Sequence, residues 1–192
     1  MRCARMFILQ CCFLLTISAA ADCAGSTASA EYILKTLVNF NATNGAGPDA
    51  NLIADSSGNL YGTTVFGGTA NDGTVFEVAN NANHTLSTLA TFNGTNGGFP
   101  EAGLIADGNG DLFGTTNQLG AGADDDGTVY EVANNANHTL STLVTFIGTN
   151  GAGSNASLSS DASANLYGTT SGLGYNSLNA GTVFEVAAGT HN

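Results

Sequence analysis

The stretch Leu60-Tyr61-Gly62-Thr63-Thr64, followed by a glycine-containing loop and by Gly73-Thr74-Val75-Phe76-Glu77-Val78, decides the fold because the chain contains it three times. The second copy occupies residues 112–116 and 127–132, and the third occupies residues 166–170 and 181–186. The later block begins at positions 73, 127 and 181, a spacing of 54 residues, and the earlier block begins at 60, 112 and 166. A fixed period of this length is typical of a repeat architecture.

The first 30 residues have the layout of a secretory signal peptide. Arg2 and Arg5 precede an apolar run at residues 6–17, and small residues follow up to Ala30. This pattern predicts export with cleavage after Ala30, and cleavage near Ala20 or lipid modification of Cys23 are the alternatives. The apolar run is shorter than the ~20 residues of a spanning helix, so we expect no stable membrane anchor after cleavage.

Residues 31–192 differ from the leader in composition. Their length is 192 − 30 = 162 residues, and they contain none of the four cysteines. Lys35 is their only Lys or Arg, against 14 acidic residues, so their net charge is 1 − 14 = −13. Such a domain repels phosphate backbones, which excludes nucleic acid as an expected partner.

Each repeat has the pattern of about four short strands joined by turns. The segment at residues 32–40 matches those at 88–92 and 142–146, which alternate apolar and polar residues with a period of two. A second short strand at residues 51–54 (also 103–106 and 157–160) leads into a turn at 55–59 that begins with Asp and suits a hairpin. The two blocks quoted above supply the other strands. We find no helical periodicity after residue 30.

This pattern predicts an all-β repeat protein of three four-stranded blades, β-propeller-like, over residues 31–192. The repeats occupy approximately residues 31–82, 83–136 and 137–192. Four short strands per unit of this length are typical of a propeller blade, whereas the coils of a β-solenoid are usually shorter. Gly62 and its equivalents Gly114 and Gly168 lie inside predicted strands, which indicates a close approach of another group. We attribute that approach to a crowded innermost strand.

The repeated motif resembles the Gloeo/Verruco (GloVer) tandem repeat. The resemblance rests on Leu-Tyr-Gly-Thr-Thr, a Gly-Gly loop and Gly-Thr-Val-Phe, preceded by Asp-x-x-Gly-Asn, and it covers nearly all of residues 31–192. It implies an exported bacterial protein with a propeller-like β fold, and it transfers no catalytic residue. This chain departs from the pattern in having three copies, in lacking an anchoring tail, and in residues 118–120 and 172–174 at the Gly-Gly loop.

Three copies are few for a closed propeller, which typically has four to eight blades. The segment at residues 32–40 could pair with residues 181–186 and close a ring. The alternatives are two chains that join into six blades as a homodimer, an open arc of three blades, and a fragment of a longer repeat protein.

The polar residues form no convincing reaction centre. His84, His138 and His191 occur once per repeat, so ring geometry separates them, and turn positions are the simpler interpretation. The spacing Asp107-x-Asn109-x-Asp111 resembles the start of a calcium loop but lacks its later glycine and glutamate. The acidic tip at residues 124–126 occurs in one repeat only, and Glu77, Glu131 and Glu185 lie in three separate units. We therefore assign no catalytic, cofactor-binding or metal-binding residue, and we expect no cofactor.

These observations favour an exported, noncatalytic binding or structural module at the cell exterior. Its ligand is unknown from the sequence, and a carbohydrate and another protein are the candidates. The alternative is an extracellular carbohydrate-active or other hydrolytic enzyme on a propeller scaffold. Carboxylates gathered in one pocket with a raised pKa would favour the enzyme, and dispersed carboxylates would favour the module.

Overall fold

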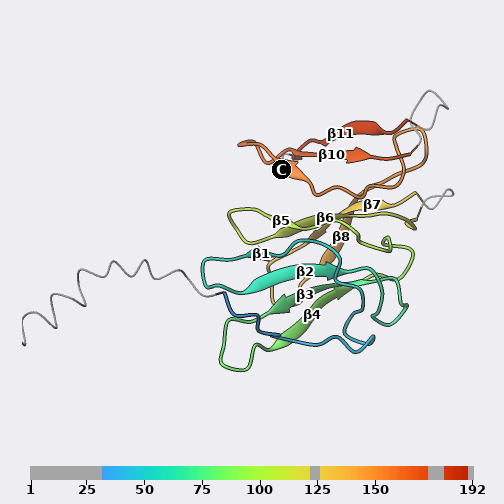
Figure 1. Cartoon of the computed structure of the whole chain (residues 1–192). Helices are drawn as coiled ribbons and strands as arrows, with labels where there is room; N and C mark the ends of the chain where they lie inside the picture. The colour runs from blue at the N-terminus through green and yellow to red at the C-terminus, as the bar shows by residue number, and fades with distance from the viewer. Residues whose placement is uncertain (1–31, 122–125, 173–179, 190–192) are drawn as a thin grey trace, which may run out of the picture. The chain divides into compact units, whose positions relative to one another are not determined.

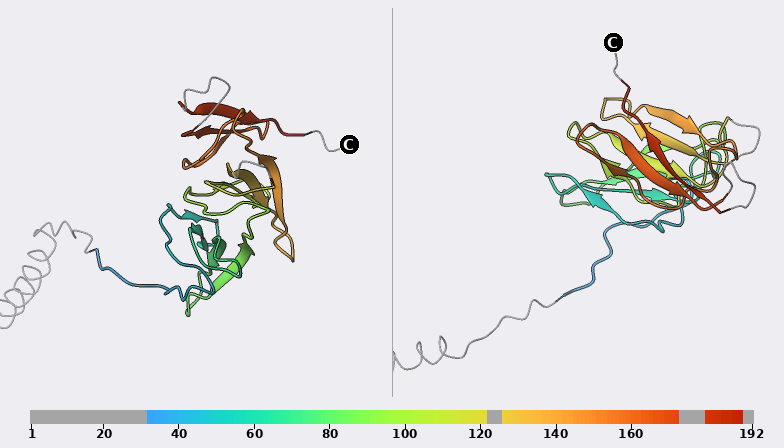
Figure 2. Two further views of the ribbon diagram at one scale, coloured as in Figure 1. Left: turned by 90° about the vertical axis from the view of Figure 1, so that its right-hand side faces the viewer. Right: turned by 90° about the horizontal axis from the view of Figure 1, so that it is seen from above.

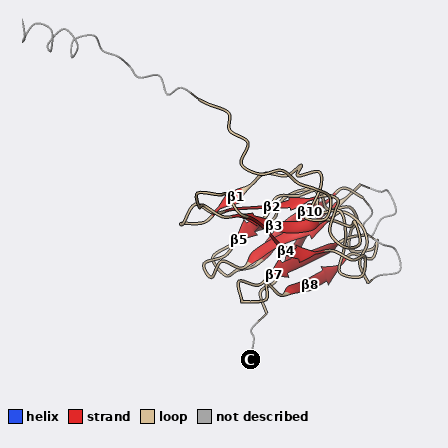
Figure 3. Cartoon of the chain, turned by 90° about the horizontal axis from the view of Figure 1, so that it is seen from below, coloured by secondary structure: helices blue, strands red, loops and turns tan. Residues whose placement is uncertain are grey.

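The computed structural model describes residues 32–121, 126–172 and 180–189. The chain divides into two units, residues 1–36 and residues 37–192. The described part of the first unit, residues 32–36, forms no regular secondary structure and is exposed. Figure 3 shows that the described ranges consist of strands joined by loops and turns. Within these ranges no helix has the length and apolar character needed to cross a membrane.

The second unit contains three antiparallel sheets (Figure 1). The first sheet has the order β1-β2-β3-β4, the second β5-β6-β7-β8, and the third β9-β10-β11. The bounds of the strands are β1 Ile53–Ala54, β2 Leu60–Thr64, β3 Thr74–Val78, β4 Leu86–Thr91, β5 Ile105–Ala106, β6 Leu112–Thr116, β7 Thr128–Val132, β8 Leu140–Thr145, β9 Ser159–Ser160, β10 Leu166–Thr170 and β11 Thr182–Val186.

The predicted all-β, blade-like architecture is confirmed. The left view of Figure 2 shows the three sheets following one another in chain order. One hydrophobic cluster joins the first sheet to the second and another joins the second to the third. The strands β1, β5 and β9 are shorter than predicted. Each has two residues, because only the last residues of the predicted strand pair with the other arm of the hairpin. The third sheet has three strands in the described part of the chain rather than four.

The sheets are out of phase with the sequence repeats. The outer strand of the first sheet, β4, comes from the second repeat, and the outer strand of the second sheet, β8, comes from the third. The strand expected at residues 32–40 is absent, and that prediction is wrong. The reason is that β4 and β8 pair with the third strand of the preceding sheet, and within the described residues no sheet precedes residues 32–40.

The strand glycines leave room for an aromatic ring, which corrects our explanation of them. Gly62 pairs directly with Phe76 on β3. A Cβ at Gly62 would lie 2.8 Å from Cζ of Phe76 and 2.7 Å from a methyl group of Leu52. Gly114 and Gly168 lie opposite Tyr130 and Phe184 in the same way. The ring of the neighbouring strand therefore covers the glycine.

A glycine-containing loop that precedes each sheet in the chain packs against a pair of threonines in that sheet. Within the second sheet the hydroxyls of Thr116 and Thr128 hydrogen-bond each other at 2.9 Å, and both side chains are buried. Gly97 lies directly over this pair, since a Cβ there would come within 2.6 Å of both hydroxyl oxygens. Gly45 and Gly151 occupy the same place over the other two threonine pairs.

Aromatic side chains connect consecutive sheets through the core. Phe92, just beyond β4, is fully buried and meets the ring of Tyr130 on β7 edge-on, with the centroids 4.9 Å apart. Phe146 meets Phe184 in the third sheet with the centroids 5.2 Å apart. Phe40 meets Phe76 in the first sheet with the centroids 4.9 Å apart. A phenylalanine that precedes each sheet in the chain thus packs against an aromatic ring of that sheet.

Tyr130 is the exception among the rings that receive these phenylalanines. Its equivalents are Phe76 and Phe184, and its hydroxyl is buried without a hydrogen-bond partner in the described part of the chain. The loss of solvation raises the pKa of Tyr130 above its ordinary value. An unsatisfied buried hydroxyl destabilises the folded state.

We therefore expect Tyr130→Phe to stabilise the protein by about 1–3 kcal/mol, because it removes the hydroxyl and keeps the ring. The measurement is the free energy of unfolding from urea titration. Phe76→Tyr, which adds a hydroxyl at the equivalent place in the first sheet, serves as the matched control and should destabilise the protein. A less stable Tyr130→Phe variant would contradict the prediction.

Candidate functional site

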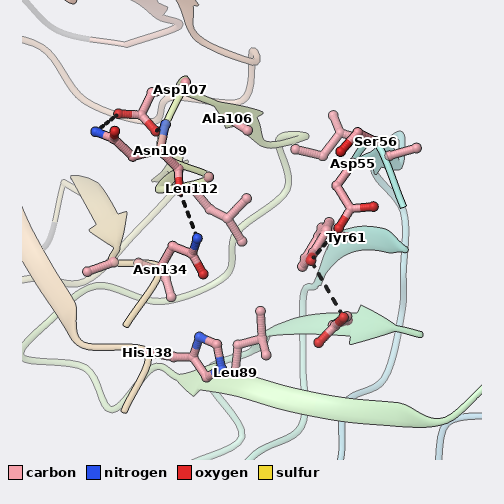
Figure 4. A pocket seen from close by; sticks show the side chains of 17 residues that line it. Asp55, Ser56, Tyr61, Leu89, Ala106, Asp107, Asn109, Leu112, Asn134 and His138 are labelled. Carbon is pink, nitrogen blue, oxygen red and sulfur yellow. Dashed lines mark hydrogen bonds between the residues drawn. The ribbon is translucent and has the colours of Figure 1, made fainter. Parts of the chain in front are cut away.

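A pocket of about 460 Å³ lies between the first and second sheets (Figure 4). The first sheet contributes the turn between β1 and β2, Tyr61 of β2 and Glu77 of β3. The second sheet contributes the turn between β5 and β6 and the turn between β7 and β8, which carries Asn134 and His138. Apolar side chains, including Leu89 and Leu112, form the rest of the wall. The pocket therefore combines an apolar wall with carboxylate, amide, phenol and imidazole groups.

Asp55 organises the first turn. Its Oδ1 accepts the backbone N–H groups of Ser57 at 2.8 Å and Asn59 at 2.9 Å. Its Oδ2 accepts the side-chain amide of Asn59 at 2.8 Å and the hydroxyl of Tyr61 at 3.2 Å. Partial desolvation acts to raise the pKa of Asp55, but these hydrogen bonds outweigh it, so the pKa lies below its ordinary value. The group is a carboxylate at neutral pH and holds the hairpin closed.

Tyr61 lies between two carboxylates. Its hydroxyl is 3.2 Å from Oδ2 of Asp55 and 3.5 Å from Oε1 of Glu77. Desolvation, together with the negative charges of Glu77 and Asp55, raises the pKa of Tyr61 to about 12. The phenol therefore stays protonated at neutral pH and serves as a hydrogen-bond donor.

The same three-residue arrangement recurs in the third sheet. The hydroxyl of Tyr167 lies 3.0 Å from Asp161 and 3.2 Å from Glu185. The hydrogen bond from the side chain of Asn165 lowers the pKa of Asp161, and the hydrogen bond to Asp161 raises the pKa of Tyr167. In the second sheet Phe113 replaces the tyrosine and pairs with Glu131 across the strands. The Asp–Tyr–Glu arrangement thus occurs in the first and third sheets and not in the second.

The calcium-like spacing at residues 107–111 forms the hairpin turn between β5 and β6. Oδ1 of Asp107 accepts the backbone N–H groups of Asn109 and Asp111, each at 2.9 Å. Oδ1 of Asp111 accepts the backbone N–H of Asn134 at 2.7 Å. The carboxylates thus bind the backbone of their own sheet. Of the acidic tip, residues 124 and 125 lie outside the described residues.

The two histidines within the described ranges lie in turns. His84 and His138 both have a left-handed backbone with φ of 46°, and each donates its backbone N–H to a residue three positions earlier. His138 lines the pocket, whereas His191 lies outside the described residues. Over the described ranges no group of three or more His, Cys, Asp or Glu side chains could hold a metal ion.

Two features of this region were not predicted from the sequence. The first is a clamp in which the side-chain amide of Asn134 donates to the carbonyl of Asn109 at 2.7 Å, and Asn80 does the same to Ser57 at 2.7 Å. The identical stretch Ala-Asn-Asn-Ala-Asn-His in two repeats was the available signal. The second is a pocket of about 370 Å³ between the second and third sheets, lined by Phe113, Asp161 and Leu166 among others. Turns of neighbouring sheets form both pockets, so no single motif marks them.

The fold and the recurrent hairpin define a class of protein, an all-β repeat protein built from blade-like sheets. The family model described as the Gloeobacter/Verrucomicrobia repeat matches residues 25–192. The chain belongs to this family, as the motif resemblance indicated. No curated protein matches the sequence.

Proposed function

We propose that this protein is an exported, noncatalytic binding module that acts at the cell exterior and uses the pocket between its first two sheets. The observation that carries the proposal is the protonation state of two groups in that pocket, Asp55 and Tyr61. Asp55 has a pKa below its ordinary value and Tyr61 one of about 12. A general acid or base works best with a pKa near the operating pH, so these two groups suit binding better than proton transfer.

The lining favours an uncharged polar ligand, and a carbohydrate is the class we propose. Carboxylate, amide and phenol groups can bind hydroxyl groups, while the walls at Leu89 and Leu112 can cover the apolar faces of a sugar ring. The net charge of −12 for the whole chain disfavours anionic ligands. Export is supported by the pattern of Arg2, Arg5 and the apolar run at residues 6–17.

The test is a glycan array followed by titration calorimetry on the glycans retained, with Tyr61→Ala and Tyr167→Ala as matched variants. Both tyrosines bond an aspartate and a glutamate of their own sheet, but Tyr61 lines the pocket between the first two sheets and Tyr167 does not. We expect Tyr61→Ala to weaken binding by roughly tenfold, the loss typical of a central aromatic contact, and Tyr167→Ala to leave it unchanged.

Equal losses in both variants, or no retained glycan, would contradict the proposal. The hydrolytic alternative predicts release of reducing sugar from a retained glycan. It also predicts that Glu77→Gln abolishes this release without abolishing binding, because glycoside hydrolysis needs a pair of carboxyl groups.

A further inference from the structure

We infer that the outer edge of β11 pairs with residues 34–39 of a second copy of this chain, so that the protein assembles head to tail through an exchanged strand. This inference is independent of the proposed ligand. It rests on the pairing of the strands, on the exposure of both segments and on one charge pair.

The edge of β11 lacks the neighbour that its equivalents have. In the first two sheets β3 pairs with β4 and β7 pairs with β8, whereas β11 pairs only with β10 in the described part of the chain. Val75 and Val129 are fully buried, but Val183 at the same position of β11 is 82% exposed. An unpaired strand edge is a template for another strand. Val75 and Val129 are buried in clusters shared with the following sheet, and the face of β11 that carries Val183 has no such cover in the described part of the chain.

Residues 34–40 have the sequence of the missing strand. They read Leu-Lys-Thr-Leu-Val-Asn-Phe, and the segments that contain β4 and β8 read Leu-Ser-Thr-Leu-Ala-Thr-Phe and Leu-Ser-Thr-Leu-Val-Thr-Phe. Yet residues 32–40 form no strand, and Leu34 is 97% exposed. An apolar segment with strand periodicity and a matching unpaired edge therefore exist in the same molecule.

The position of Phe40 indicates which sheet residues 34–39 would complete, namely a sheet that comes before the first one. Phe92 and Phe146 follow outer strands that complete one sheet, and they insert into the next sheet. Phe40 already inserts into the first sheet of its own chain, against Phe76. The six residues before it therefore correspond to the outer strand of a preceding sheet, which a second copy can supply as its third sheet.

The charges support this pairing. The register of the first two sheets sets Glu77 opposite Ser87 and Glu131 opposite Ser141. The same register on β11 sets Glu185 opposite Lys35, the only lysine in the sequence. Opposite charges placed directly across two strands stabilise the pair. The internal strands carry serine at this position, and the exposed one carries lysine.

A second copy is a better occupant than the same chain. Closing one chain on itself would make a ring of three blades, fewer than the four to eight of closed propellers. Two copies joined twice make six blades. Head-to-tail contacts of this kind form rings when the rotation closes and longer arrays when it does not.

The first test is covalent capture with the full-length gene product purified after export and loss of its leader, with Cys23 replaced by serine in case cleavage occurs near Ala20, and carrying Val38→Cys and Val183→Cys. The register of Val75 with Ala90 places these two positions opposite each other. We expect a disulfide between chains under mild oxidation, seen as a band of twice the mass or a ladder on a non-reducing gel. The single variants Val38→Cys and Val183→Cys are the controls and should give far less. A disulfide within one chain, or none, overturns the inference.

The second test is reversal of charge, read by light scattering over a range of concentrations. Lys35→Glu should weaken association by roughly tenfold, because it sets two like charges across each shared pair of strands. The double variant Lys35→Glu with Glu185→Lys should restore it, while circular dichroism shows the same fold throughout. A wild-type protein that is monomeric at all concentrations, or a double variant no better than Lys35→Glu, overturns the inference.

Discussion

Gly127→Ala is expected to lower the free energy of unfolding by about 3 kcal/mol or more. The substitution places a residue with a Cβ at a positive φ and brings that Cβ into a clash with backbone atoms. Gly127 has a φ of 95°, a conformation that residues with a Cβ rarely adopt. A Cβ there would meet the carbonyl oxygen of Thr116 and lie 2.9 Å from that of Asn117. These atoms belong to the backbone at the end of β6, so no side chain can move aside.

The strain would spread because the backbone of Gly127 is hydrogen-bonded to two other segments of the chain. Its N–H donates to the carbonyl of Leu119 at 2.9 Å, and its carbonyl accepts the N–H of Phe146 at 2.9 Å. A shift of Gly127 therefore disturbs the entry of Phe146 into the third sheet. Urea titration measures the effect, and Gly108→Ala is the matched control. A Cβ at Gly108 meets nothing within 4 Å, so we expect a change within about 0.5 kcal/mol there. Equal stability of the two variants would contradict the prediction.

Phe92→Ala is expected to destabilise the protein by about 3–5 kcal/mol, the range for deleting a buried aromatic side chain. Phe92 is fully buried and packs in one cluster with Val75 and Ala90 of the first sheet and Leu104 and Tyr130 of the second. Its removal leaves a cavity between two sheets, which the surrounding residues fill only partially when they relax.

Thermal unfolding provides the measurement, and the melting temperature should fall by roughly 10 °C for a domain of this size. Phe66→Ala is the control, since the Phe66 side chain is exposed and meets Phe99 at a centroid distance of 5.8 Å. The control should lose much less stability. A Phe92→Ala variant as stable as Phe66→Ala would show that the sheets do not depend on this joint.

The fold was predictable from the sequence because the repeat itself carries the local signals. The turn beginning at Asp55 recurs at Asp107 and Asp161, and in each copy the carboxylate accepts the backbone N–H groups that close the hairpin. The predicted strands at residues 60–64 and 73–78 match β2 and β3 to within one residue. Short-range hydrogen bonding fixes such features, so a single unit of sequence suffices to predict them.

Features that depend on a neighbouring unit were not predictable. Residues 32–40 have the alternation of a strand, but a strand also needs a partner, and this condition cannot be read from the segment. Gly62 is a different case, because its partner lies in the same sheet. We attributed this glycine to a crowded innermost strand, whereas the side chain of Phe76 on the adjacent strand occupies the space beside it. The pocket at Tyr61 arises because two turns separated by about one repeat face each other, and neither turn alone resembles a binding motif.

The offset between sheets and sequence repeats bears on how such a chain can grow during evolution. A duplicated 54-residue unit brings the strand that completes the sheet upstream of it and leaves its own sheet for the next unit to complete. In-frame gain of whole units therefore creates no unfinished sheet inside the array, wherever the breakpoint falls within a repeat. Copy number can change by recombination without any compensating substitution at the junction.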